Sequence, residues 1–316
     1  MLARWVTAVL GAAALAALPP LIGFQPYYLY LLSTAYLFAT MASAWGLLAS
    51  SGQISFGHAA FFGLGAYGAA LASLGGIWPW WSILVGALAG SAGGLLIGLA
   101  SLRLRGAYLA LATLAYAELW RGIALNWTEV TGGGAGLLGI PALPPVPGLP
   151  IDFTRGRAGS YYLALGVLVA MLGAYALIAS SRAGLAFSAV REEEERASLL
   201  GLHPLPWKLL AFALSAWFTG LVGGLYVHLV RLVEPDLVFS RYYSILPLIM
   251  ATFGGPHSRL GPAVAAVGLY LLTELLLTPL APALRQSLYA LVLILVILYL
   301  PGGLAGLATR RSRAHP

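Results

Sequence analysis

The sequence predicts an all-α, polytopic membrane protein with about ten transmembrane helices (eight to ten), and three observations carry this prediction. Hydrophobic residues make up 60% of the 316 residues and charged residues only 9%, whereas soluble domains contain about 25% charged residues. The apolar runs last roughly 20 residues, which favours helices over the shorter alternating strands of a β-barrel. The 39 glycines are typical of helices that pack closely in a membrane.

The apolar segments, taken in chain order, predict ten spans within a single transmembrane domain that covers residues 1–316. Two segments are weaker, because 53–74 is rich in glycine and 243–256 is short; either one is re-entrant or broken if it does not span. The first segment has an alternative, since Arg4, an apolar stretch and Ala14-Leu15-Ala16 resemble a cleaved signal peptide. The predicted spans are 5–22, 27–49, 53–74, 80–101, 107–125, 159–180, 208–230, 243–256, 260–280 and 285–301.

The distribution of basic residues predicts a multi-pass protein of the cytoplasmic (inner) membrane with both termini in the cytoplasm. In this orientation eleven basic residues lie on the cytoplasmic side and five outside, as the positive-inside rule requires. The longest loop, about residues 126–158, then lies outside. It joins Thr131, Gly132 and Gly133 to a proline-rich stretch, which predicts an ordered but non-helical loop. Such a loop either meets an external partner or substrate or is a plain connection.

The most polar segment of the chain lies between the spans at 159–180 and 208–230, in a cytoplasmic loop of about residues 181–207. Four of the ten acidic residues stand there side by side, and so polar a segment must project into water. Gly201 is predicted to cap the C-terminus of a short helix, with Pro204 and Pro206 behind it. The loop is therefore predicted to be a rigid handle for another protein, with the residues Arg191, Glu192, Glu193, Glu194, Glu195, Arg196, Ala197 and Gly201.

Several functional classes conflict with the composition. Sixteen of the 17 basic residues are arginine, and the single lysine, Lys208, does not follow a glycine. A P-loop needs Gly-Lys-Ser/Thr to hold phosphates, so this chain binds no ATP and no other cofactor is expected in it. The chain has no cysteine, and its five histidines are scattered, so no metal site is predicted. The arginines are spread over loops and ends, which argues against nucleic acid and for the lipid bilayer as the surrounding medium. No catalytic cluster is apparent, and the chain is not expected to be an enzyme.

Polar residues inside apolar segments are candidates for a translocation path. Gln53, Ser55, Gly57 and His58 stand close together at the start of the predicted span 53–74. In lipid such groups must either line a water-filled path or be satisfied by helix packing, and both interpretations stay open. Thr131, Gly132 and Gly133 of the outer loop are further candidates.

Two carboxylates in predicted spans point to a rival mechanism. Glu118 lies three residues before Arg121, so the two share a helix face and are expected to pair, either within the membrane or at its hydrated outer interface. Glu274 is the second carboxylate within a predicted span. Lone carboxylates of this kind are typical of ion-coupled carriers.

Several motifs resemble the branched-chain amino acid ABC permeases, and they occur in the order found in that family. The stretch Glu195-Arg196-Ala197-x3-Gly201 resembles the EAA-x3-G coupling loop of ABC importer permeases. Residues 52–61 are similar to the family's GQ-S-GHAAF stretch, residues 102–110 to its LR-RG-YLA segment, and residues 131–141 to the TGG…GIP loop of the longer of its two permease subunits. Residues 254–262 and 300–304 resemble its GG-x-GS-GP and LP-GL patterns. Arg196 departs from the pattern, because it replaces an alanine.

The resemblance implies a permease subunit that pairs with a second, homologous permease, with two P-loop ATPase subunits below and an extracytoplasmic substrate-binding protein outside. ATP and Mg²⁺ would be used by the ATPase subunits, which would grip the loop around residues 191–203. The unusual acidity of that loop predicts an ATPase groove with basic residues.

The substrate and the class of transporter have alternatives. Branched-chain amino acids are the substrates that the resemblance implies, and urea, short amides or other amino acids are carried by similar permeases. An ion-coupled secondary transporter that uses Glu118 or Glu274 is the rival from another class, and a membrane-embedded enzyme is a distant third.

Overall fold

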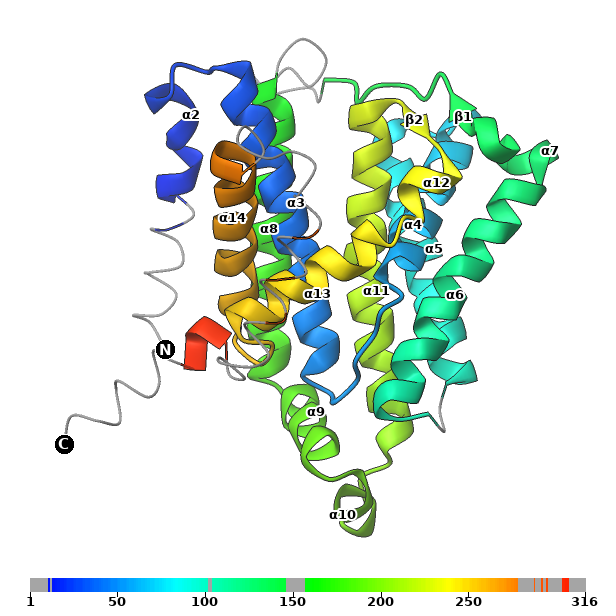
Figure 1. The fold of residues 1–316 in the computed structure, drawn as a ribbon, viewed down its shortest axis with the longest axis vertical. Coiled ribbons are helices and arrows are strands. Elements are labelled where there is room, and N and C mark those ends of the chain that lie inside the picture. The colour runs from blue at the N-terminus through cyan, green and yellow to red at the C-terminus, as the bar shows by residue number, and fades with distance from the viewer. Residues whose placement is uncertain are drawn as a thin grey trace.

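The computed structural model describes residues 11, 13–101, 104–145, 157–277, 287, 291, 294 and 303–306. The described part is almost wholly helical, as the sequence predicts (Figure 1). Its elements, in chain order, are α2 (Leu18–Leu21), α3 (Pro26–Ala49), α4 (His58–Leu74), α5 (Pro79–Ala100), α6 (Gly106–Asn126), α7 (Thr128–Thr131), the 3-10 turn η1 (Gly133–Ala135), β1 (Leu137–Leu138), α8 (Arg157–Ala179), α9 (Arg182–Glu192), α10 (Glu194–Leu199), α11 (Pro204–Val230), β2 (Leu232–Val233), α12 (Pro235–Val238), α13 (Tyr242–Gly254), α14 (Gly261–Leu272) and the π-helical η2 (Thr273–Leu277).

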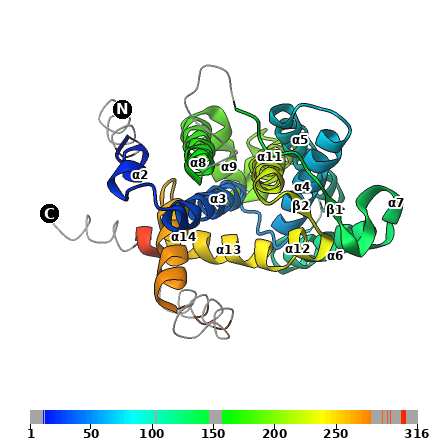
Figure 2. The ribbon, with the colours of Figure 1, turned by 90° about the horizontal axis from the view of Figure 1, so that it is seen from above.

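The long helices form a bundle around α3. Helix α3 is the most enclosed of the candidate spans, with 89% of its apolar window buried, and α11 follows with 67%. Seen from above, α3 and α11 lie in the interior and α5, α6, α8 and α14 lie around them (Figure 2). Prolines at the first turn begin α3, α5 and α11, because proline has no N–H to lose there and its φ already suits a helix.

Helices α4, α5 and α11 meet through glycine. A Cβ at Gly90 of α5 would lie 2.8 Å from the Ala216 carbonyl oxygen and 2.8 Å from the Cα of Gly220, both on α11. Gly65 of α4 lies against the Gly220 backbone as well. Small residues allow backbones to approach this closely in a membrane protein, and the three helices therefore form one tightly packed unit.

Five described segments are long and apolar enough to cross a membrane, namely Pro26–Ala49, Pro79–Ala100, Arg157–Ala179, Pro204–Val230 and Pro235–Gly254. The total of ten spans is not reached by these criteria. Residues 5–10 and 12 of the predicted first span 5–22 and most of the predicted span 285–301 lie outside the described residues. Helix α6 has the length of a span, but its sequence is not apolar enough to be counted with the five.

The predicted span 53–74 is wrong in its first part, because the helix begins only at His58. Gly52 has a φ of +81°, which breaks the chain after α3, and residues 53–57 are not helical. Within a membrane, non-helical backbone is tolerated only where other parts of the protein satisfy its hydrogen bonds. The segment is therefore broken at residues 53–57, and a membrane span by residues 58–74 stays a prediction. The 17 residues of α4 extend over about 26 Å, less than a full hydrocarbon core.

Most of the predicted span 243–256 lies within the candidate span Pro235–Gly254, of which α13 is the longer helical part. Helix α13 has 13 residues, with Pro247 inside it, so its length is about 20 Å. It runs obliquely across the bundle between α14 and α12 (Figure 1).

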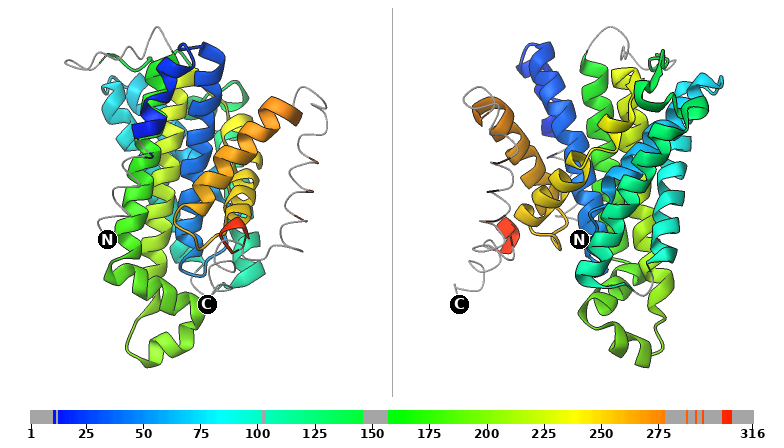
Figure 3. Two further views of the ribbon diagram at one scale, coloured as in Figure 1. Left: turned by 90° about the vertical axis from the view of Figure 1, so that its left-hand side faces the viewer. Right: turned by 45° about the vertical axis from the view of Figure 1, so that its right-hand side comes forward.

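The bundle has two distinct ends. Helices α9 and α10 project beyond one end (Figure 3), and we call it the α9–α10 end. At the opposite end, β1 and β2 pair antiparallel, with Leu137 opposite Val233 and Leu138 opposite Leu232. Arg105, Arg182, Arg191, Arg196 and Lys208 belong to elements at the α9–α10 end, and Arg157 and Arg231 to the β1–β2 end, whereas Arg241 lies at the start of α13. The assignment of the α9–α10 end to the cytoplasm stays a prediction.

Candidate functional site

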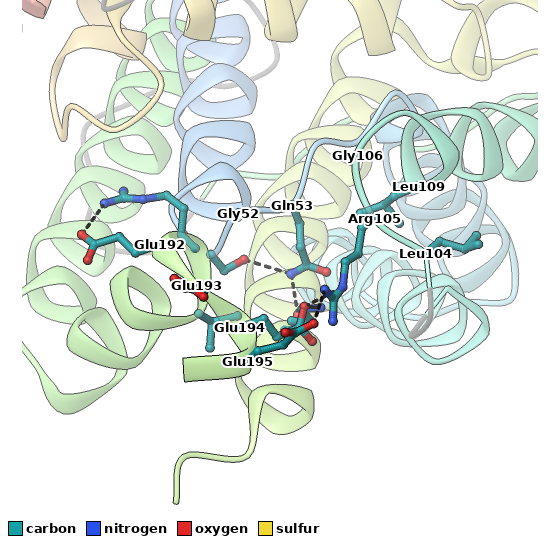
Figure 4. Close-up of a pocket in the computed structure, with 14 residues that line it drawn as sticks. Gly52, Gln53, Leu104, Arg105, Gly106, Leu109, Glu192, Glu193, Glu194 and Glu195 are labelled. Atoms are coloured by element: carbon teal, nitrogen blue, oxygen red, sulfur yellow. Dashed lines mark hydrogen bonds and ion pairs between the residues drawn. The ribbon is translucent and has the colours of Figure 1, made fainter. Parts of the chain in front are cut away.

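The acidic loop folds into two helices that meet at Glu193. The Ser181 hydroxyl caps α9 by accepting a hydrogen bond from the Ala183 N–H at 3.2 Å. This is the typical contact of a serine at an N-cap. Glu193 then has an extended backbone, with φ −160° and ψ 105°, and α10 begins at the next residue. The acidic run is therefore not one continuous helix. The side chains of Glu194 and Glu195 lie together near Arg105, while that of Glu192 lies apart from them (Figure 4).

Gly201 closes α10 as the sequence predicts. Its φ is +82°, the Leu202 N–H donates to the Ala197 carbonyl at 3.0 Å, and the Gly201 N–H donates to the Ser198 carbonyl at 3.0 Å. This pair of bonds is a Schellman motif. Ala197 is the buried residue of α10, whereas Leu199 and Leu200 are 87% and 88% exposed. The loop thus presents two leucines to its surroundings in a fixed geometry.

Glu194 is the inward-facing member of the acidic run. Lys208, in the first turns of α11, donates from Nζ to Glu194 Oε2 at 2.6 Å. Arg105, directly before α6, reaches the same oxygen with Nε at 3.1 Å. The side chains of Lys208 and Glu194 are only 11% and 22% exposed, so this contact is more shielded from water than the other ion pairs of the loop. Glu194 therefore joins α10 to α11 and α6, and we call these three residues the ionic joint.

The other charges of the loop remain accessible to water. Glu193 pairs with Arg196 at 2.8 Å, Arg105 lies 3.7 Å from Glu195, and Arg191 lies 3.8 Å from Glu192. The carboxylate side chains in these pairs are 47% to 81% exposed, and exposed pairs of this kind contribute at most about 1 kcal/mol each to folding. They are available for contact with another protein.

The segment after α3 reaches the same place. A Cβ on Gly52 would lie 3.0 Å from the Arg191 Cα, so this glycine allows the segment to lie directly against α9. Gln53 donates from Nε2 to the Lys208 carbonyl at 3.2 Å and to the Ser51 hydroxyl at 2.9 Å. Residues of this segment, of the start of α6 and of the acidic loop line one open pocket (Figure 4). Gln53, predicted as part of a translocation path, thus lies beside the acidic loop.

The rest of this segment enters the interior and bonds to four helices. The Trp45 indole of α3 donates to the Ser55 carbonyl at 2.8 Å, and the Phe56 N–H donates to Thr113 Oγ1 of α6 at 2.9 Å. A Cβ on Gly57 would lie 2.5 Å from the Thr113 carbonyl oxygen. His58 Nε2 lies 3.0 Å from Ser215 Oγ of α11, and the Ala59 N–H donates to Ser244 Oγ of α13 at 2.9 Å. Ser55 and His58 are fully buried, so in this chain they are surrounded by protein.

The Thr131-Gly132-Gly133 turn lies at the β1–β2 end, far from the acidic loop. Gly132 and Gly133 have positive φ values of 75° and 58°, which glycine adopts without strain. The Thr131 hydroxyl lies 2.6 Å from the Ala124 carbonyl and fixes the turn to α6.

His228 is a residue that the sequence analysis missed. It lies in the last turn of α11 and is 2% exposed. Its Nδ1 is 2.8 Å from the Pro141 carbonyl of the outer loop, and its Nε2 is 2.7 Å from Ser82 Oγ of α5. The only local signal was a polar residue in an apolar span, and its partners are distant in sequence. His228 fastens the loop after β1 to the bundle.

Glu118 and Arg121 pair as their spacing predicts, at 3.4 Å, but they belong to a larger network. Arg241 donates from Nε to Glu118 at 2.7 Å, and Arg121 lies 2.6 Å from Asp236 of α12. Glu118 is therefore not a lone carboxylate. Glu274 lies in η2 and is also engaged in an interaction. We call the group Glu118, Arg121, Asp236 and Arg241 the α6–α12 charge network.

The predicted site residues thus fall into three places. Those of the acidic loop meet Gln53 at the α9–α10 end, Ser55, Gly57 and His58 lie in the interior, and Glu118 with Thr131, Gly132 and Gly133 lies toward the β1–β2 end. Within the described ranges, no group of three or more His, Asp or Glu side chains is arranged to hold a metal ion. The arrangement joins the projecting helices α9 and α10 to α6 and α11 through Glu194.

Comparisons with known proteins identify the family of this chain. The family model described as "Branched-chain amino acid transport system / permease component" matches residues 27–298. The chain is 33% identical over 247 residues to the high-affinity branched-chain amino acid transport system permease protein LivM of Escherichia coli K12. It is 34% identical over 249 residues to the protein of the same name from Salmonella typhimurium LT2. Each alignment covers 72% of this chain.

The alignments span 58% of the length of these two relatives, and no solved structure matches the chain. The match to the family model covers most of the chain, including α3 to α14 and the acidic loop. The chain is therefore a member of the family of permease components of branched-chain amino acid transport systems.

Proposed function

We propose that this chain is a membrane-spanning subunit of an ABC importer that moves branched-chain amino acids, or a related small polar solute, across the cytoplasmic membrane. One observation carries the proposal: the α9–α10 handle projects from the bundle and is tied to α6 and α11 through Glu194. The two LivM relatives are named for branched-chain amino acid transport, which supports the substrate. In this proposal the α9–α10 end and both termini lie in the cytoplasm.

The chain needs partners to perform this work. Its single lysine is committed to Glu194 and does not belong to a P-loop, so two P-loop ATPase subunits would supply the ATP-driven movement. They would bind α9 and α10 through the exposed Leu199 and Leu200. The exposed carboxylates of Glu192, Glu193 and Glu195 would add ionic contacts. A second, homologous permease would complete the channel, and an extracytoplasmic binding protein would deliver substrate.

Movement of the handle would reach the interior by two routes. The first is the ionic joint, which ties α10 to the beginnings of α6 and α11. The second is the segment 52–59, which begins against Arg191 and ends in hydrogen bonds to α11 and α13. We propose that Gln53, Ser55, Gly57 and His58 act in this transmission and that the substrate path runs along the permease–permease interface toward Glu118 and the Thr131-Gly132-Gly133 turn.

The function is tested by extracting the tagged chain from its native membrane in mild detergent and identifying the proteins that co-purify. We expect a second permease and P-loop ATPases. Proteoliposomes of the complex, supplied with the binding protein, should then take up labelled leucine only with ATP. Competition by unlabelled urea or short amides in place of leucine would reassign the substrate. Transport by the chain alone under an ion gradient would contradict the proposal and favour a secondary carrier that uses Glu118 or Glu274.

Replacement of Gly201 by leucine is expected to uncouple ATP hydrolysis from uptake. A Cβ at this position meets nothing within 4 Å, so the variant should fold, but the left-handed φ of +82° disfavours leucine by about 1–2 kcal/mol. The end of α10 would therefore change its direction. We expect hydrolysis by the assembled complex to continue while uptake falls by about tenfold, which corresponds to about 1.4 kcal/mol.

Gly76 provides a matched control. Its φ is +92° and its Cβ would also meet nothing within 4 Å, but it lies in the connection between α4 and α5, away from the handle. Gly76→Leu should carry similar strain and leave the ratio of uptake to hydrolysis unchanged. Normal coupling in Gly201→Leu would contradict the handle mechanism.

A further inference from the structure

The helices at the surface of this bundle differ sharply in how well they suit lipid. Helix α8 has a mean hydropathy of 2.2 and only 28% of its apolar window is buried, and α5 has a mean hydropathy of 2.0 with 44% buried. Exposed side chains of these helices include Leu88 of α5 and Leu177 of α8, which are 58% and 61% exposed. Lipid chains can contact an exposed helix surface of this hydropathy without a desolvation penalty. The side of the bundle formed by α5 and α8 therefore suits lipid.

Helix α6 is exposed and is less apolar than the five candidate spans, although its exposed residues include Leu111 and Leu119. Only four of its 21 residues are buried, Leu109, Thr113, Ala117 and Ala124. Among the described helices of 18 residues or more, it alone is not apolar enough to be a candidate span. It also carries Glu118 and Arg121, which pair with Arg241 at the start of α13 and with Asp236 of α12. This side of the bundle thus combines exposure with charge.

The charge network lies about two helical turns inside one end of α6. Glu118 precedes Asn126, the last residue of α6, by about two turns, and a rise of 1.5 Å per residue places it about 12 Å below that end of the helix. The side chains of Arg241, Asp236 and Arg121 are 69%, 54% and 39% exposed, and that of Glu118 is 32% exposed. Charged groups open to hydrocarbon cost about 2.5–3.5 kcal/mol each near the bilayer centre, so lipid is an unfavourable cover for this face.

We propose that the face formed by α6, α12 and α13 is the surface on which the second permease subunit packs, and that the α6–α12 charge network lies in the polar outer half of that interface. Because the network lies on the side of the bundle and about two turns inside the end of α6, a second permease beside the chain suits this face better than a partner that approaches the end of the bundle. The network contains two arginines and two carboxylates, so it presents no net charge and fits a partner surface that is polar but not strongly charged. In the view from above, α6, α12 and α13 lie along one side of the molecule and α5 and α8 along the opposite side (Figure 2).

This proposal rests on the proposed function, because it names the face used by a partner that the function requires. The absence of cysteine from the chain makes a direct test possible. Single cysteines are introduced at Gly122, one turn above Glu118, and at Ile245, one turn after Arg241. A Cβ at Gly122 meets nothing within 4 Å, and Ile245 is 38% exposed, so both positions accept a sulfhydryl-linked photo-cross-linker. Leu88→Cys and Leu177→Cys on the opposite side are the matched controls.

Each variant is labelled, photolysed in native membranes and purified, and the adducts are identified by mass spectrometry. We expect adducts with the second permease from positions 122 and 245, and only lipid adducts from positions 88 and 177. Adducts with the second permease from 88 or 177, together with lipid adducts from 122 and 245, would overturn the interface while leaving the proposed function in place. Failure of any second permease to co-purify with the unlabelled parent chain would overturn both. Adducts of the chain with itself from positions 122 and 245 would show that the partner on this face is a second copy of this chain and not a homologous permease.

Discussion

Replacement of Glu194 by glutamine is expected to abolish most uptake while the ATPase subunits stay bound. Lys208 donates to Glu194 at 2.6 Å with a side chain that is only 11% exposed, and Arg105 reaches the same oxygen. Removing one partner of a shielded ion pair leaves the other charge without compensation, which costs about 3 kcal/mol or more. Because the lost contact joins the handle to α11 and α6, we expect uptake to fall more than tenfold at an unchanged level of ATP hydrolysis, measured on the same purified complex.

The neighbouring Glu195 supplies the control for this result. Its side chain is 81% exposed and its ion contact with Arg105 is 3.7 Å long, so Glu195→Gln should lose at most about 1 kcal/mol. It removes the same charge from the same loop and should leave the coupling ratio unchanged, although it can weaken binding of the ATPase. Equal uncoupling by both variants would show that the net charge of the loop matters and that the ionic joint does not.

A double-substitution cycle tests whether Glu194 and Lys208 act through their mutual contact or independently of each other. Lys208→Met removes the other partner and should reduce uptake in the same way as Glu194→Gln. Both single variants break the same contact between Glu194 and Lys208. Uptake by the double variant should therefore be no lower than uptake by the more severe single variant, and the coupling energy obtained from the cycle should be well above zero. Strictly additive losses would mean that Glu194 and Lys208 act separately.

The ionic joint was not predictable from the sequence, although its surroundings were. The charge of residues 192–195, the helix end at Gly201 and the pairing of Glu118 with Arg121 depend on neighbours within one or two helical turns, and such local signals survive in a single sequence. The choice of Glu194 over the three other glutamates depends on Lys208 and Arg105, which belong to other helices. A solvated acidic face was therefore the natural interpretation of all four residues.

The break before α4 illustrates the same limit. Residues 53–57 follow an apolar helix and precede another, so hydropathy averaged over a window assigns them to a span. They are held instead by hydrogen bonds with three other helices: Trp45 donates to the Ser55 carbonyl, and the segment itself donates to the Thr113 hydroxyl and the Lys208 carbonyl. Tertiary contacts of this kind override local propensity. The candidate path residues were thus found by their polarity, while their actual neighbours had to come from the structure.

Glycine gives the clearest case, because two glycines that look alike in the sequence have opposite surroundings. Replacement of Gly90 by leucine is expected to prevent stable folding of the chain. A Cβ at Gly90 would lie 2.8 Å from the Ala216 carbonyl oxygen, 2.8 Å from the Gly220 Cα and 3.1 Å from the Phe61 carbonyl oxygen. These are backbone atoms of α11 and α4, which cannot move aside as a flexible side chain does. Overpacking against movable neighbours already costs about 1–3 kcal/mol, so we expect a larger loss here, seen as aggregation of the detergent-extracted variant and a lower unfolding temperature.

Replacement of Gly173 of α8 by leucine is the control that distinguishes the effect of close packing from that of helix propensity. It also lies inside an apolar helix, but a Cβ there would meet nothing within 4 Å. Leucine favours helices over glycine by roughly 0.5–1 kcal/mol, so Gly173→Leu should keep or slightly raise the unfolding temperature. Gly90→Ala should lie between the two leucine variants, because it adds only the Cβ. If Gly90→Leu were as stable as Gly173→Leu, α4, α5 and α11 could not be as close as the glycine contacts require, and the routes by which the handle reaches the interior would need a different geometry.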